Sequence, residues 1–135
     1  MKIVHAYPPN IDQIDEVFKV RGTPGVVYTY GDTIYVPDGS VVSPSLKSHE
    51  GVHYSRQTND RGAIEAWWAR YLTDAEFRLA EELPAHRAEF RTFCALHKDR
   101  TLQMRMLHAI ADRLAGPLYG GLISASRARN LIHAR

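Results

Sequence analysis

Residues 43–57 read SPSLKSHEGVHYSRQ, and this segment forms the central helix of the predicted fold. Ser43 followed by Pro44 is typical of a helix start, because serine caps free backbone N–H groups and proline fits the first turn. The segment therefore predicts a helix from Pro44 to about Gln57. Within it lies His49-Glu50-Gly51-Val52-His53, an HExxH sequence.

The HExxH residues have the spacing of a zinc site. On a helix, residues four apart lie on one face, about 6 Å apart along the axis. His49 and His53 can therefore bind one zinc ion, whose bonds to histidine nitrogen are about 2.0–2.1 Å long. Glu50 points towards the same opening, where it can take a proton from water that the metal has made more acidic. The motif predicts two metal ligands and a catalytic base.

Gly51 lies inside this predicted helix, where glycine costs about 1 kcal/mol relative to alanine. One interpretation is that the missing side chain lets a neighbouring segment approach the metal closely. The other is that the glycine is only tolerated.

A hydrolytic zinc site needs a third protein ligand and an open fourth position. The metzincin pattern is excluded, because Arg56 and Asn59 stand where that class has glycine and histidine. A glutamate from a later helix is the expected third ligand. Glu82 is preferred because it shares a helix face with the small Ala85, and Glu81 remains an alternative. The full set of candidates is Glu65, Glu76, Glu81, Glu82 and Glu89.

Several other residues have expected roles near this site. His86 lies one turn beyond Glu82, where it can hydrogen-bond an oxyanion or support a metal ligand, or simply be a half-buried polar residue. Tyr54 and Tyr71 are further accessory candidates. The Trp67-Trp68 pair is expected in the core, and Cys94 is interpreted as a small core residue rather than a nucleophile.

The remaining elements follow from periodicity and from turn residues. A helix over 11–19 precedes a β-hairpin over 26–36, whose turn is expected at Tyr30–Thr33. Further helices are predicted over 62–72, 74–97, 101–115 and 125–133, with a kink at Pro84. The fold class is therefore α+β and mostly helical. We expect one domain over 1–135, made of an N-terminal helix and hairpin (1–42), metal-site helices (43–97) and a C-terminal helical tail (98–135).

Composition narrows the class of protein. The chain has 135 residues, 44% of them hydrophobic, which is enough for one core. No run approaches the roughly 18 apolar residues of a membrane span, and because no long apolar run follows Lys2 we expect no signal peptide. The single cysteine excludes an internal disulfide framework and favours a reducing compartment such as the cytoplasm.

Charge is distributed unevenly along the chain. Residues 1–90 contain nine Lys/Arg and thirteen Asp/Glu, a net −4, whereas residues 91–135 contain eight and two, a net +6. The basic residues are spread out rather than clustered, so nucleic-acid binding is the weaker interpretation and a solvated helix face the stronger one.

Three segments carry a family resemblance: HEGVHYSRQ (49–57), EAWWARYLTDAEFRLAEELPAH (65–86) and GPLYGGLIS (116–124). Together with the N-terminal region they resemble small metallopeptidases that tailed bacteriophages and prophages encode, over nearly the whole chain. The resemblance implies a minimal gluzincin-like zincin domain with a small N-terminal β-sheet packed on the HExxH helix. It also implies one Zn²⁺ held by His49, His53 and the glutamate three before Ala85, which is Glu82.

The expected function is that of a zinc metalloendopeptidase, with Glu50 as the general base. The outer edge of the hairpin is expected to bind an extended peptide by strand addition. The alternative is a structural or adaptor component of a phage particle that keeps the metal for stability. Expected partners are a peptide or protein substrate or phage structural proteins, with no membrane. The expected location is the host cytoplasm or the virion.

Overall fold

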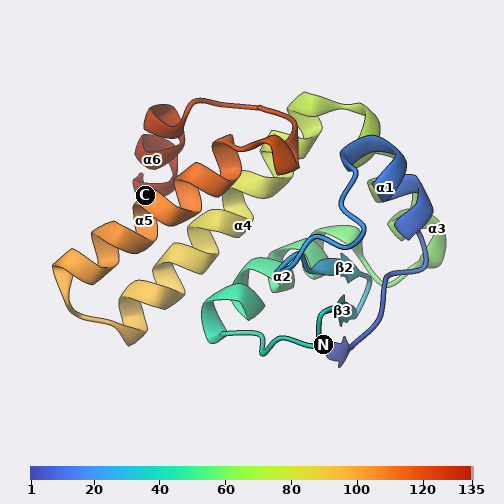
Figure 1. The fold of residues 1–135 in the computed structure, drawn as a ribbon, viewed down its shortest axis with the longest axis horizontal. Helices are drawn as coiled ribbons and strands as arrows, with labels where there is room; N and C mark the ends of the chain where they lie inside the picture. Colours follow the sequence, from blue (N-terminus) through green and yellow to red (C-terminus); the bar gives the residue numbers. More distant parts are fainter. Residues whose placement is uncertain (135) are drawn as a thin grey trace.

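The structure is a computed structural model that describes residues 1–134 (Figure 1). It confirms the mostly helical α+β fold expected from the sequence. The strands are β1 (Lys2–Val4), β2 (Tyr28–Tyr30) and β3 (Thr33–Tyr35), and the helices are α1 (Ile11–Phe18), α2 (Pro44–Gln57), α3 (Arg61–Thr73), α4 (Ala75–Leu96), α5 (Arg100–Ala115), η1 (Pro117–Tyr119, a 3₁₀ helix) and α6 (Ala125–His133). None of the helices in this part of the chain combines the length and apolar character that a membrane span requires.

Helix starts are well predicted where a side chain caps them, which is the case for α2 to α6 but not for α1. Ser43 Oγ accepts a hydrogen bond from the Leu46 N–H at the start of α2, as expected. Asp74 caps α4 in the same way through the Phe77 N–H. Helix α4 continues through Pro84, whose ring nitrogen has no hydrogen to donate to the preceding turn.

The sheet has the strand order β1-β3-β2. Strands β2 and β3 form the predicted antiparallel hairpin, in which Tyr30 pairs with Thr33 and Gly31 adopts a positive φ of 59°. Strand β1 pairs with β3 in parallel, with Ile3 opposite Ile34. This third strand was not predicted, because three residues with exposed side chains carry no alternating pattern. Strand β2 therefore forms one edge of the sheet, on the side of α2.

Two larger apolar clusters lie on either side of α2, and a third, made of Ile34, Val36 and Val42, packs against Leu46 of α2 itself. The first packs α1 and α3 against β2, and its buried members are Ile11, Ile14, Val20, Tyr28, Ile64, Trp67, Trp68 and Tyr71. The second joins α4, α5 and α6 through Phe90, Leu107, Ile110, Ala111, Leu114, Ala128 and Ile132, with the half-buried Cys94 packed against it. Figure 1 shows α2 between these two groups of elements. The tryptophan pair thus lies in the core, as expected.

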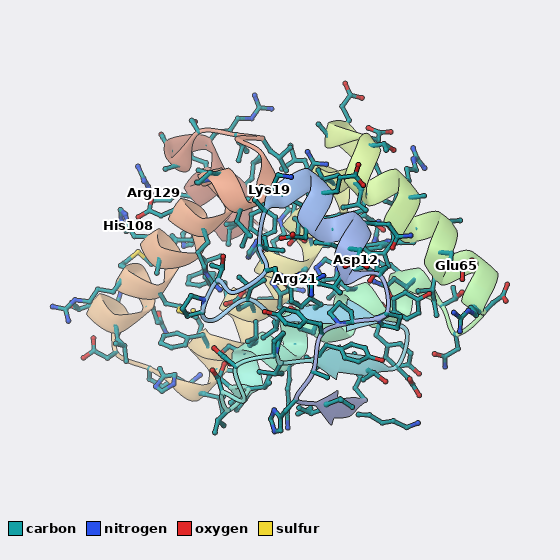
Figure 2. The ribbon with its side chains drawn as sticks, turned by 45° about the vertical axis from the view of Figure 1, so that its right-hand side comes forward. Asp12, Lys19, Arg21, Glu65, His108 and Arg129 are labelled. Carbon is teal, nitrogen blue, oxygen red and sulfur yellow. The ribbon has the colours of Figure 1, made fainter. Side chains whose placement is uncertain are left out.

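Charged side chains spread over the surface rather than forming one patch. Figure 2 shows His108 on α5 and Arg129 on α6 projecting outwards, and Glu65 at the outer side of α3. Near α1, Arg21 pairs with Asp12 at the surface. Arg113 of α5 is an exception within the basic C-terminal region, because it pairs with the buried Glu89 of α4.

Gly51 on α2 has open space around it, because nothing lies within 4 Å of the position that a Cβ would take. The interpretation that a neighbouring segment approaches closely there is wrong. Gly51→Ala is therefore expected to raise the free energy of unfolding by up to about 1 kcal/mol, through the lower backbone entropy of alanine. Urea unfolding of the two proteins measures this difference.

Gly31→Ala is the matched comparison and should lower the free energy of unfolding. Its φ is 59°, and a Cβ there would lie 2.8 Å from Ile64 Cδ1. A Gly51→Ala protein no more stable than the wild type would show that glycine does not limit the stability of α2.

Candidate metal centre

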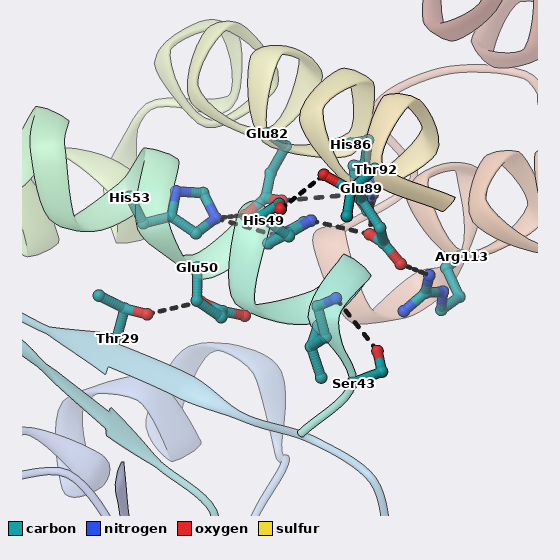
Figure 3. A network of polar contacts seen from close by, with 12 residues as sticks. Thr29, Ser43, His49, Glu50, His53, Glu82, His86, Glu89, Thr92 and Arg113 are labelled. Carbon is teal, nitrogen blue, oxygen red and sulfur yellow. Dashed lines mark hydrogen bonds and ion pairs between the residues drawn. The ribbon is translucent and has the colours of Figure 1, made fainter. Parts of the chain in front are cut away.

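Three predicted ligands converge where α2 crosses α4 (Figure 3). His49 Nε2 and His53 Nε2 are 3.2 Å apart. Glu82 Oε2 lies 3.3 Å from His49 Nε2, and Glu82 Oε1 lies 3.2 Å from His53 Nε2. All three side chains are buried. The structure thus brings together residues from α2 and α4, two helices that α3 separates in the sequence.

These distances fit one metal ion. A tetrahedral ion with bonds of about 2.0–2.1 Å holds its ligand atoms about 3.3–3.4 Å apart. The buried Glu82 Oε2 has no hydrogen-bond partner within residues 1–134, and a cation would satisfy it. The three residues therefore fit a single bound metal ion.

Local packing explains why the two helices approach so closely. Ala85, one turn after Glu82, is completely buried, and its small side chain lets α4 lie against α2. Further along the same interface, the Ser48 and Thr92 hydroxyls form a hydrogen bond of 2.6 Å. The interface between α2 and α4 is thus built from small and polar side chains.

A second layer of contacts holds the ligands in place. His49 Nδ1 donates to Glu89 Oε1 at 3.0 Å, so its Nε2 lone pair is left for a metal ion. Glu89 in turn pairs with Arg113 of α5 at 2.5 Å. The Tyr71 hydroxyl donates to Glu82 Oε1 at 2.7 Å. Sequence reasoning considered Glu89 only as a ligand, although its position two turns after Glu82 places both on one helix face.

The charges of this group also suit a divalent cation. Glu50, Glu82 and Glu89 are between 2% and 4% exposed, and Arg113 supplies one positive charge through its ion pair with Glu89. Three negative charges and one positive charge leave a net of −2, and burying an uncompensated charge is costly. A divalent cation would bring this buried group to neutrality.

Without a metal ion, a proton on His49 supplies part of the positive charge that the buried carboxylates need. Burial lowers the pKa of His49, but hydrogen bonds to Glu82 and Glu89 outweigh it and raise the pKa to about 10. Burial raises the pKa of Glu82, but the neighbouring His53 and His49 hold it well below its usual range. A metal ion that binds here must displace the proton of His49, so metal binding is coupled to proton release.

Glu50 lies beside these ligands, and with His49 and His53 it forms a group whose ligand atoms all lie within 4.8 Å of one another. Its Oε2 accepts a 2.6 Å hydrogen bond from the Thr29 hydroxyl of β2. Glu50 lines a cavity of about 70 Å³ together with His49, His53 and Glu82. The rest of the lining is mostly apolar and includes Ile14, Phe18, Val26, Val27, Trp67 and Leu118. A buried carboxylate, a group of metal donors and an apolar pocket therefore share one cavity.

Two of the candidate residues are engaged elsewhere. Glu81 accepts a hydrogen bond from Trp67 Nε1 at 2.6 Å and pairs with Arg56 at 2.5 Å, which turns its carboxylate away from the histidines. The Tyr54 hydroxyl accepts a hydrogen bond from Asn59 at 3.0 Å and lies outside the metal group. The accessory role expected of Tyr54 therefore has no contact to support it, and Glu82 rather than Glu81 faces the two imidazoles.

His86 lies directly behind the metal group. Its ring is completely buried, with Nε2 3.5 Å from Glu82 Oε2 and Nδ1 3.4 Å from Glu89 Oε1. Burial and the positive charge of His49 lower the pKa of His86 to about 4, against the pull of the two carboxylates. His86 is therefore neutral at physiological pH, and with His49 and Glu82 it forms a second group whose atoms could hold a metal ion.

Glu82→Gln is expected to lower the affinity for Zn²⁺ at least tenfold, because it removes a charged ligand from the group. Glu81→Gln is the matched control and should bind Zn²⁺ like the wild type, since Glu81 faces Trp67 and Arg56. Competition with a chromogenic chelator, together with elemental analysis, measures both proteins. Equal affinity of Glu82→Gln and wild type would remove Glu82 from the ligand set.

Comparison of the chain with models of known protein families, with curated proteins and with solved structures finds no match. The resemblance to phage metallopeptidases therefore remains a prediction. The description of this centre depends on the distances, burial and charges of the chain's own residues.

Proposed function

We propose that this protein is a zinc-dependent metallopeptidase. The observation that best supports this proposal is the position of the Glu50 carboxylate in the same cavity as the converging donors of His49, His53 and Glu82. A metal site that served stability alone would have no use for a further buried acid in the cavity beside its ligands. The proposal keeps the ligand set and the base that the sequence predicts.

Zinc is the metal that the donor set favours. Two imidazoles and one carboxylate, with a further position left for water, form a common catalytic zinc site. When bound, the ion supplies Lewis acidity, which lowers the pKa of a water molecule from about 15.7 to about 7 and polarises a carbonyl group. The side chains Tyr71 and Glu89 hold Glu82 and His49 for this purpose.

Glu50 handles the proton in the proposed reaction. Its carboxylate takes the proton of the attacking water while the water oxygen bonds to the peptide carbonyl carbon. The same proton then passes from Glu50 to the leaving nitrogen as the carbon–nitrogen bond breaks. The products are a carboxylic acid and an amine, and Glu50 returns to its ionised form.

The hydrogen bonds of β2 restrict how a peptide can bind by strand addition. Gln57 Nε2 and Trp68 Nε1 both donate to the Thr29 carbonyl, at 2.9 and 3.2 Å. The Gly31 N–H donates to Gln57 Oε1 at 2.8 Å. These edge groups are therefore already paired. A peptide can therefore add to the sheet along the segment before Thr29, where Val27 lines the cavity. The apolar lining of the cavity suits an apolar substrate side chain.

Glu50→Gln should retain zinc while its rate of peptide cleavage falls by about 10²- to 10⁴-fold, the usual contribution of a positioned base. A fluorogenic peptide library measures the rate, and elemental analysis measures the zinc. Glu65→Gln is the matched control, because Glu65 lies exposed on α3 (Figure 2) and should leave cleavage unchanged. Undiminished cleavage by Glu50→Gln would contradict the assignment of the base.

One observation favours a second candidate function, a structural zinc site in an adaptor protein. His86 is completely buried, and its Nε2 is 3.5 Å from Glu82 Oε2, near enough to become a fourth protein ligand after a small shift. Four protein ligands close a zinc site, which then contributes folding free energy rather than catalysis. A component of a phage particle, the alternative expected from the sequence, would suit such a site.

His86→Phe separates the two candidates. In a peptidase the variant keeps zinc and cleaves peptides, because His86 lies behind the ligands; in a closed structural site it loses zinc. X-ray absorption of the zinc-loaded wild type provides an independent measurement. Two imidazoles in the coordination shell indicate the open site, and three indicate the closed one.

A further inference from the structure

We propose that Thr29 is the positioning residue that aims Glu50, an inference that rests on the proposed function. The Thr29 hydroxyl donates to Glu50 Oε2 at 2.6 Å, and both residues are buried (Figure 3). A hydroxyl has a single proton, so this bond commits it to Glu50. One oxygen of the carboxylate is thereby held in place, and the other is left to accept the proton of the attacking water.

Thr29 is itself fixed through its backbone. Its carbonyl accepts hydrogen bonds from Gln57 and Trp68, and Gln57 is only 1% exposed. Gln57 lies seven residues after Glu50, on the same face of α2. The helix that carries Glu50 thus fixes the strand residue that orients Glu50. This closed set of contacts leaves Thr29 little freedom to move away.

The contact between Thr29 and Glu50 is a hydrogen bond to a neutral side chain. The Thr29 hydroxyl holds one carboxylate oxygen of Glu50 in place. By contrast, the carboxylates of Glu81 and Glu89, which carry no proton in the proposed reaction, pair with Arg56 and Arg113.

Thr29→Val and Thr29→Ser test this role. Valine keeps the size and shape of threonine but lacks the hydroxyl, whereas serine keeps the hydroxyl. Because a hydrogen bond to a charged group is lost, kcat of the zinc-loaded Thr29→Val protein should fall about ten- to a hundredfold, with KM unchanged. The Thr29→Ser protein should remain within about threefold of the wild type.

A second readout needs no substrate. The visible absorption of the Co²⁺-loaded protein responds to the groups around the metal. Thr29→Val should change this spectrum in the direction that Glu50→Gln does, and Thr29→Ser should reproduce the wild-type spectrum. Circular dichroism shows whether each variant is folded.

The outcomes are distinct. A Thr29→Val protein like the wild type in both readouts overturns the inference, and so does a Thr29→Ser protein that is as impaired as Thr29→Val. Loss of folding or of Co²⁺ from Thr29→Val alone also overturns it, because the residue would then be structural. If the wild type cleaves no peptide while the Co²⁺ spectrum still distinguishes valine from serine, the proposed function fails and the role of Thr29 in orienting Glu50 is supported.

Discussion

Helix α2 packs against its neighbours through polar side chains. The rest of the structure depends on the hydrogen bonds and ion pairs that these buried side chains make. The buried residues of α2 are Ser45, His49, Glu50, His53 and Gln57. This buried face has no large apolar side chain. Apart from Leu46, which packs against Ile34, Val36 and Val42, the helix is held largely by hydrogen bonds and charge. These contacts are directional, so the positions of His49, Glu50 and His53 are fixed by the same interactions that hold the helix.

The two larger apolar clusters provide the rigid frame for this polar layer. The first cluster supplies Trp68 and Tyr71, which reach the layer through the Thr29 carbonyl and Glu82. The second is linked to it by Arg113, whose guanidinium pairs with Glu89. A metal ion at the crossing of α2 and α4 would therefore connect elements from both clusters, and its binding would contribute to the stability of the whole fold.

Much of the fold was predictable because it depends on local signals. The bounds of α2 match the prediction, since Ser43 and Pro44 mark its start, and α6 was predicted over its observed residues. Glu82 was preferred because it shares a helix face with Ala85 and His86, while Glu81, four residues before Ala85, remained an alternative. These inferences need only the spacing of residues along one helix.

The remaining features depend on contacts between distant segments. Thr29 and Glu50 are 21 residues apart, and Arg113 and Glu89 are 24 apart, and no spacing rule relates such positions. Thr29 is an ordinary strand residue in the sequence, so its hydrogen bond to Glu50 becomes visible only in three dimensions. Tyr54 was an accessory candidate, yet its hydroxyl accepts a hydrogen bond from Asn59 and lies outside the metal group.

Gln57 has one more consequence for the molecule. Its carboxamide bonds to the Thr29 carbonyl and to the Gly31 N–H, the two groups that a fourth strand would use at this place. An exposed strand edge invites pairing with another molecule, which leads to aggregation. The buried side chain of Gln57 thus prevents another strand from pairing with this part of β2. It thereby protects the chain from self-association next to the buried polar group of His49, Glu50 and His53.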